Sequence, residues 1–182
     1  MPPSLLALHE MPTLTGLVTP REFYLITKDP APLAGMPYPK ASTPWEVLFR
    51  LGIRHIVRLE MERLPYDPSP LSLLLTLGIQ DLVDAGPPRD PEAEQRMAME
   101  AVSAILSRLK QGEGVIVHCV GGTGRTGTVL GCCLVGLGHP AQQVITYLDQ
   151  LNKLRGKKGW PESAWQSELV SRFASLKWTL EE

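Results

Sequence analysis

The order of sequence patterns predicts an α/β fold whose central, largely parallel sheet carries helices on both faces. Short apolar runs rich in Ile and Val, at 53–59 and 115–118, indicate buried strands. Periodic segments bounded by capping and stop residues lie between such runs and indicate amphipathic helices. Strands that alternate with helices are typical of crossover connections, and therefore of a parallel sheet with helices packed against it.

Length and composition indicate one folded domain. The chain has 182 residues, of which 43% are hydrophobic and 20% charged, as is usual for a soluble globular protein. A net charge of −1 gives no global field for nucleic acid or an anionic membrane, so neither is an expected partner. No apolar run reaches the roughly 18 residues of a membrane span, and the N-terminus lacks the pattern of a signal peptide.

Cysteine usage indicates a reducing compartment. Three cysteines are present, and with two of them adjacent, at Cys132 and Cys133, they do not make a disulfide framework. We therefore expect a cytoplasmic protein, and a monomer. Cys132 and Cys133 are expected to be small core residues, with a redox partnership to Cys119 as the alternative.

The N-terminal half begins with an expected irregular lead-in over 1–20, which is rich in proline and lacks periodicity, before a single domain over 21–182. Thr43 is expected to cap a helix, with Pro44 at the first helical position, Glu46 completing a capping box and Gly52 as the stop. The other expected segments are a strand at 23–27, a loop at 28–42, a strand at 53–59, a Leu-rich helix at 70–77, a short extended segment at 79–83 and a loop at 84–88.

The C-terminal half begins with a strong helix start at Asp90-Pro91, because Asp caps helices and proline suits their first turn. That helix is expected to reach about Gln111, and the apolar run 115–118 then predicts a buried strand. Three further helices are expected, over 124–137, 140–154 and 161–176. The functional loop should lie at the carboxyl end of the 115–118 strand, where such sheets place ligands.

Residues 115–127 read Val-Ile-Val-His-Cys-Val-Gly-Gly-Thr-Gly-Arg-Thr-Gly and join a nucleophile to an anion cradle. A Gly-rich loop that opens a helix can turn its N–H groups around a phosphate-sized anion. Arg125 can grip two phosphate oxygens with its planar fork, and the same positive environment favours the reactive thiolate of Cys119. The predicted phosphate-binding residues are Val120, Gly121, Gly122, Thr123, Gly124 and Arg125.

The pattern His118-Cys119-(five residues)-Arg125-Thr126 resembles the signature of the cysteine-dependent protein tyrosine phosphatase superfamily, and the element order resembles its compact dual-specificity members. The resemblance implies phosphomonoester hydrolysis through a cysteinyl-phosphate intermediate, without a metal or cofactor. It implies a phosphorylated protein as substrate, carrying phosphotyrosine and also phosphoserine or phosphothreonine, or else a small phosphoester. Superfamily members that act on inositol lipids often carry basic residues in this loop. No lysine lies inside it here, so the resemblance counts mildly against a phosphoinositide.

The general acid for the leaving oxygen must come from another loop. Asp84 is the preferred residue, because it follows a short extended segment and opens the loop Asp-Ala-Gly-Pro-Pro before the long helix. This pattern resembles the acid loop of compact dual-specificity phosphatases. Asp81, three residues earlier, is the alternative.

Further residues are assigned supporting roles. Thr126 is expected to donate its hydroxyl to the Cys119 sulfur, and His118 to act as a buried positioning residue. The resemblance places an arginine at the end of the penultimate helix, Arg155, and a glutamine near the pocket, Gln166, which would orient water. Two assignments have alternatives. Lys157 and Lys158 lie either at the rim of the pocket or in a solvated loop, and Tyr38 either flanks the substrate or has a packing role.

A second hypothesis for the same loop is a dinucleotide-binding oxidoreductase, because Gly122, Gly124 and Gly127 form a G-x-G-x-x-G pattern after a strand. That pattern requires a second strand ending in an acidic residue about 20 positions further on. Residues 140–154 are expected to be helical instead, which disfavours the oxidoreductase.

Overall fold

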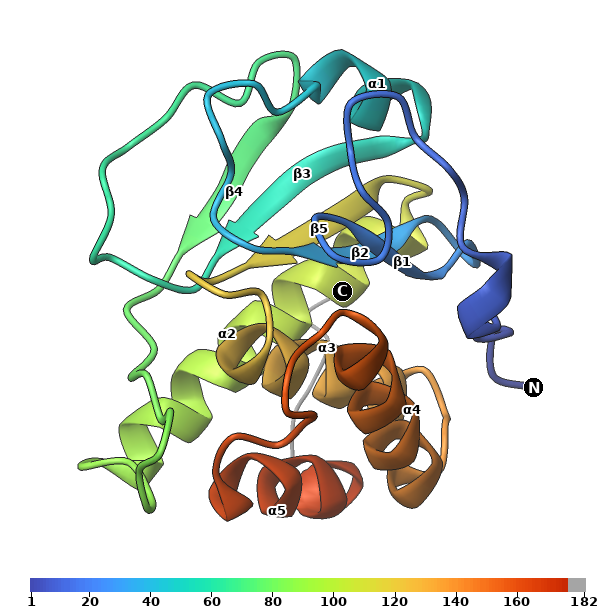
Figure 1. The fold of residues 1–182 in the computed structure, drawn as a ribbon. Coiled ribbons are helices and arrows are strands. Elements are labelled where there is room, and N and C mark those ends of the chain that lie inside the picture. The colour runs from blue at the N-terminus through green and yellow to red at the C-terminus, as the bar shows by residue number, and fades with distance from the viewer. Residues whose placement is uncertain (177–182) are drawn as a thin grey trace.

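The computed structural model describes residues 1–176 and contains a mixed, mostly parallel five-stranded sheet with the strand order β1-β2-β5-β3-β4 (Figure 1). The strands are β1 (Tyr24–Thr27), β2 (Leu33–Met36), β3 (Ile53–Arg58), β4 (Ser72–Thr76) and β5 (Gly114–His118). Only β1 runs antiparallel to its neighbour, at one edge. The predicted α/β class with a largely parallel sheet is confirmed.

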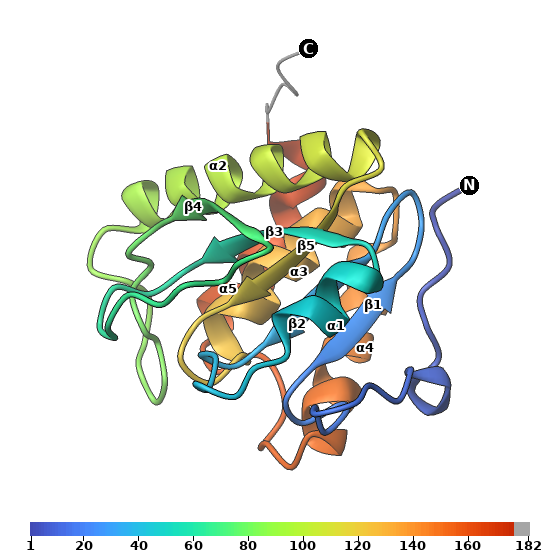
Figure 2. The same cartoon turned by 90° about the horizontal axis from the view of Figure 1, so that it is seen from above.

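Helices cover the two faces unequally. They are α1 (Trp45–Arg50), α2 (Pro91–Lys110), α3 (Gly124–Gly136), α4 (Ala141–Leu154) and α5 (Ala164–Arg172), with short 3-10 turns at Leu8–Glu10 and Phe173–Ser175. Helices α2 to α5 lie on one face and α1 on the other (Figures 1 and 2). The central strand β5 is buried on both faces, with Val117 in the larger core and Ile116 in the core beneath α1, as expected for a parallel strand between two layers.

The predicted secondary structure of two segments was wrong, because each of them contains a strand of the sheet. The expected loop 28–42 contains β2, which fills the gap between β1 and β5 and pairs with both. Its Gly35 lies beneath the Tyr24 ring, since a Cβ there would be 2.3 Å from that ring. The expected helix 70–77 contains β4, a parallel edge strand on β3. Consecutive leucines suit either structure, and pairing with β3 decides in favour of the strand.

The segment 79–83, expected to be extended, forms no strand and is held by α2. The Gln80 N–H donates to the Glu94 carboxylate, 3.1 Å from the nearer oxygen, and the Gln80 side-chain oxygen accepts from the Arg89 N–H at 3.0 Å. Both bonds are made by Gln80, so they fix the start of the segment beside α2.

Helix starts were predicted with mixed success. Asp90 caps α2 as predicted, accepting from the Ala93 N–H at 3.0 Å. The capping box at Thr43 is wrong, because α1 begins at Trp45 after Pro44 and no side chain caps it. The helix expected from residue 161 begins at Ala164, where the Gln166 side chain accepts from the Ser163 N–H at 3.2 Å.

The N-terminal residues pack along the β1 edge of the sheet (Figure 2). The Leu6 N–H donates to the Ile26 carbonyl at 2.8 Å, and the Tyr147 hydroxyl donates to the Leu6 carbonyl at 2.9 Å. Such packing covers a strand edge that would otherwise be free to pair. The domain boundary after residue 20 stays a prediction, and the expected domain end at 182 lies outside the described residues. Over residues 1–176, no helix has the length and apolar character needed to cross a membrane.

Candidate active site

The glycine-rich loop lies at the carboxyl end of β5 and leads directly into α3, as predicted. Cys119 follows the last residue of the strand, and α3 begins at Gly124. Gly122 has φ +69°, and a Cβ there would lie 2.6 Å from the Met36 and Pro37 backbone. Only glycine fits both the left-handed conformation and this close approach.

Buried side chains hold the back of this loop. The Tyr24 hydroxyl and the Arg155 guanidinium donate to the Gly122 carbonyl at 2.7 and 2.8 Å, and Arg155 also donates to the Gly121 carbonyl at 3.1 Å. In a trans peptide the next N–H points opposite to the carbonyl. The N–H groups of Gly122 and Thr123 are therefore directed to the other side of the loop, where an anion would bind.

The Cys119 thiol is almost fully buried, with 3% of the residue exposed. The Thr126 hydroxyl, in the first turn of α3, lies 3.1 Å from the Cys119 sulfur and donates to it. A donor at this distance stabilises a thiolate more than a thiol. The structure thus brings Thr126 and the Cys119 sulfur together, as the sequence predicted.

His118 is fully buried and bonded at both ring nitrogens. Its Nδ1 lies 2.9 Å from the Cys119 carbonyl, and the Tyr66 hydroxyl lies 2.6 Å from Nε2. Burial lowers the pKa of His118 to about 4, so the ring is neutral near pH 7. A neutral ring that donates from Nδ1 and accepts at Nε2 satisfies both contacts.

The Arg125 guanidinium is buried and faces two carboxylates. It donates to Glu62 at 2.7 Å and to the Ile79 carbonyl at 3.2 Å, and it lies 3.6 Å from Asp81. Burial alone would lower the pKa of Arg125, but the negative charges of Cys119 and Glu62 outweigh it and raise that pKa. An oxyanion in the loop would compete with these carboxylates for the guanidinium.

The two candidate acids occupy different places. Asp81 accepts from the Val83 N–H at 3.0 Å and faces Arg125. Asp84 has φ +52° and is exposed, and it lines a cavity of about 480 Å³. Thr123, from the glycine-rich loop, lines the same cavity, so Asp84 and one residue of that loop border a common space.

The segment before α5 forms the other wall of this cavity, with Lys157, Lys158 and Glu162 among its lining residues. The Trp160 indole donates to the Gly124 carbonyl at 3.2 Å, which joins the segment to the glycine-rich loop. Gln166 is buried, and its side-chain oxygen accepts from the Glu162 N–H at 2.8 Å. Its amide nitrogen faces Gly124, because a Cβ on that glycine would lie 3.1 Å from it.

Sequence reasoning missed several residues at this site. Glu62 and Glu162 belong to no motif, and only the fold brings them beside Arg125 and Gly124. A buried ion pair of 2.7 Å between Arg58 and Glu60 anchors the segment that carries Glu62. Charged residues directly after a buried strand were the one available signal, since buried charges are normally paired.

Cys132 and Cys133 lie on α3, fully buried. Burial raises the pKa of each thiol, so both are protonated thiols packed in the core. This environment matches their expected structural role.

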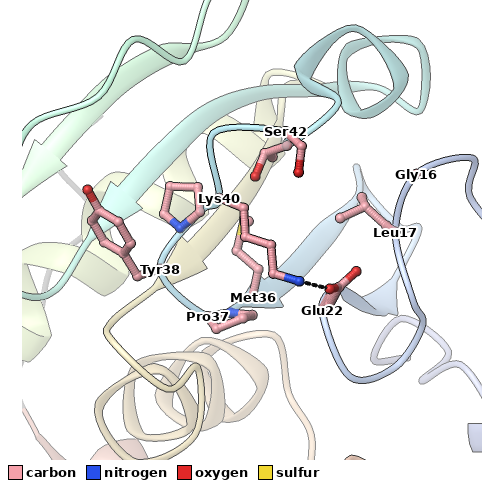
Figure 3. A pocket seen from close by; sticks show the side chains of 10 residues that line it. Gly16, Leu17, Glu22, Met36, Pro37, Tyr38, Lys40 and Ser42 are labelled. Atoms are coloured by element: carbon pink, nitrogen blue, oxygen red, sulfur yellow. Dashed lines mark hydrogen bonds and ion pairs between the residues drawn. The ribbon is translucent and has the colours of Figure 1, made fainter.

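A second cavity, of about 210 Å³, lies beside the loop after β2. Figure 3 shows the Lys40 ammonium reaching the Glu22 carboxylate across it. Tyr38 lines this cavity and also packs edge-on against His118, with ring centres 6.0 Å apart. The Tyr38 N–H donates to the Val120 carbonyl at 2.9 Å, so Tyr38 forms the border between this cavity and the glycine-rich loop.

Comparison with known families gives a direct match. The family model PTP-SAK, described as a Swiss Army Knife protein, DSP-PTPase phosphatase domain, matches residues 20–159. The chain belongs to this phosphatase family. The PTP-SAK domain is accordingly a protein-tyrosine-phosphatase-like phosphoester hydrolase, and the resemblance seen in the sequence is confirmed.

Solved structures support the same fold for the PTP-SAK domain. A mouse putative dual specificity phosphatase has a TM-score of 0.65 at 18% identity, covering 88% of this chain and 91% of its own. Tk-PTP in its active form has a TM-score of 0.59 at 23% identity, covering 79% and 91%. PTPMT1, solved with PI(5)P, has a TM-score of 0.57 at 17% identity, covering 79% and 90%. The dinucleotide-binding hypothesis is set aside, because α4 lies where its second strand would be required.

Proposed function

We propose that this domain hydrolyses phosphomonoesters through a cysteinyl-phosphate intermediate. The observation that carries the proposal is the loop itself, which holds the Cys119 sulfur 3.1 Å from the Thr126 hydroxyl at the start of α3. Arg125, buried in the same turn of α3, supplies the positive charge. A thiolate, a cradle of N–H groups and a guanidinium together provide nucleophile and charge stabilisation without a metal.

In the first step the Cys119 thiolate attacks phosphorus in line with the leaving oxygen. The sulfur–phosphorus bond forms as the phosphorus–oxygen bond breaks, and Asp84 gives its proton to the departing oxygen. Arg125 leaves Glu62 to bind the equatorial oxygens with the loop N–H groups. The position of Asp84 on the cavity that Thr123 also lines supports its assignment over Asp81.

In the second step water attacks the phosphorus and the thiolate leaves with the bonding electron pair. Thr126 stabilises the departing sulfur through its hydroxyl. A carboxylate accepts the proton of the water, and Asp84, ionised by the first step, is the residue that the sequence predicts for this task. His118 positions Cys119, and Gln166 helps to orient the water.

We propose a phosphorylated protein as the substrate, with phosphotyrosine first and phosphoserine or phosphothreonine as further residues, in the cytoplasm. Aromatic side chains support this choice. Tyr38 and Tyr66 pack edge-on with ring centres 5.8 Å apart, and both rings lie beside His118. Aromatic groups of this kind can pack against a phosphoaryl ring. A small phosphoester is the alternative, supported by Lys157 and Lys158 at the cavity.

A substrate panel with Cys119→Ser as the control tests this proposal. We expect the wild-type protein to release phosphate from a phosphotyrosine peptide faster than from a phosphoinositide or a nucleotide. The C119S variant should release none, because a serine hydroxyl is not ionised near pH 7. Wild-type turnover by C119S would contradict the mechanism. A preference for the phosphoinositide would contradict the substrate class and leave the mechanism standing.

A further inference from the structure

Glu162 is a fourth carboxylate at the active site, beside Glu62, Asp81 and Asp84, and it has no part in the reaction described so far. Its carboxylate lies against the glycine-rich loop, because a Cβ on Gly124 would be 2.0 Å from the Glu162 oxygen. It lines the same cavity as Asp84 and Thr123. A charged group this close to an anion cradle is unfavourable for phosphate binding, so its presence calls for a chemical reason.

The Glu162 backbone is fixed from three sides. Its N–H donates to the Gln166 side chain at 2.8 Å, and the preceding Trp160 bonds to Gly124. The next residue, Ser163, donates its hydroxyl to the Gly86 carbonyl at 2.9 Å, which ties this segment to the acid loop. Asp84, two residues before Gly86, shares this last bond, but it is exposed at a left-handed turn. Glu162 is therefore the better positioned of the two carboxylates.

The direction of attack favours a base on this wall. Water in the second step approaches phosphorus opposite the sulfur, from the side on which the leaving group departs. Asp84 and Glu162 line one cavity together with Thr123 of the glycine-rich loop. We propose that Glu162 is the catalytic base of the second step, and that Asp84 serves mainly as the acid of the first.

The local electrostatics agree with this division. Burial, assisted by the negative charge of Asp81, raises the pKa of the Glu162 carboxyl. A carboxylate with a raised pKa is a stronger base toward water than one with an ordinary value. In the proposed step the Glu162 carboxylate takes one proton from water as the new phosphorus–oxygen bond forms, and the Cys119 thiolate departs with the electron pair of the broken phosphorus–sulfur bond.

This inference rests on the proposed cysteinyl-phosphate mechanism, and pre-steady-state kinetics with 4-nitrophenyl phosphate separate the two. The first turnover releases one nitrophenol for each enzyme molecule as the intermediate forms, and the steady state reports its hydrolysis. For E162Q we expect an unchanged burst rate and a burst of one equivalent. The steady-state rate should fall on the order of 10²-fold, the usual contribution of a general base. Mass spectrometry of acid-quenched E162Q should show one phosphoryl group on Cys119.

Two controls define the outcome. Glu168→Gln makes the same charge change at an exposed position of α5, and both of its phases should match the wild type. For E162A, added formate should restore part of the steady-state rate, which a purely structural role would not permit. An E162Q steady state equal to that of the wild type, or a loss confined to the burst, would overturn this role of Glu162. Wild-type bursts from C119S would overturn the proposed function instead.

Discussion

Protonation of His118 should destabilise the folded protein as the pH falls. The ring is fully buried between the Tyr66 hydroxyl and the Cys119 carbonyl, and burial lowers its pKa from 6.5 to about 4. Between these two values the unfolded chain binds more protons than the folded one. Acidification therefore lowers the free energy of unfolding, and the loss levels off below about pH 4.

The size of the effect follows from the two pKa values. With 6.5 for the unfolded chain and about 4 for the folded one, linkage gives a loss of about 2 kcal/mol between pH 7 and pH 5, and about 3 kcal/mol by pH 4. Carboxylates titrate in the same range. Their contribution cancels when the free energy of unfolding of H118N is subtracted from that of the wild type at each pH.

Urea unfolding at pH 7, 6 and 5 measures this difference. We expect the stability advantage of the wild type over H118N to shrink by about 2 kcal/mol across that range. The control is His9→Asn, which removes a histidine that is exposed instead of buried. A wild-type minus H118N difference that changes by less than about 0.5 kcal/mol would mean that His118 is not held neutral, and the reasoning from burial would fail.

Four further predictions concern the active site. Asp84→Asn should slow hydrolysis of phenyl phosphate by about 10²-fold or more but hardly affect 4-nitrophenyl phosphate, since a poor leaving group needs the acid. The same pattern in D81N instead of D84N would show that Asp81 is the acid. Ser163→Ala removes the bond to Gly86 and should lower the free energy of unfolding in urea by about 1 kcal/mol. Because Gly86 lies in the loop that carries Asp84, the hydrolysis rate should fall more for phenyl phosphate than for 4-nitrophenyl phosphate. Gly122→Ala puts a Cβ 2.6 Å from the Met36 backbone at φ +69° and should cost more than about 1 kcal/mol, with weaker inhibition by inorganic phosphate. EDTA dialysis should leave wild-type turnover unchanged, and its loss with recovery on adding metal would contradict the proposed mechanism.

The sequence predicted the central elements well because their signals are local. Strand β5, its loop and α3 were found from an apolar run followed by glycines, and α2 from its Asp90 cap. Strand β2 was missed because its place depends on partners far away in the sequence. Its four residues include Gly35, which looks like a loop residue until the Tyr24 ring is seen to lie over it.

The same distinction applies to the active site. Cys119, Arg125 and Thr126 lie within one short stretch, so spacing alone predicted that they would meet. The partners of Arg125 could not be predicted in this way. Glu62 reaches it from the segment after β3 and Asp81 from the segment before α2, and only the parallel order of the sheet places both segments at the same edge.

Arg155 shows how far the glycine-rich loop depends on the rest of the chain. Its guanidinium is buried with 3% of the residue exposed, and it donates to the Gly121 and Gly122 carbonyls and to those of Pro20 and Arg21. A buried cation is tolerated only when its donors are satisfied. Here carbonyl oxygens from two distant segments satisfy them, and the Tyr24 ring lies 4.6 Å from the guanidinium. Because one side chain holds both segments, the shape of the anion cradle depends on the turn at residues 20–21 as well as on the motif itself.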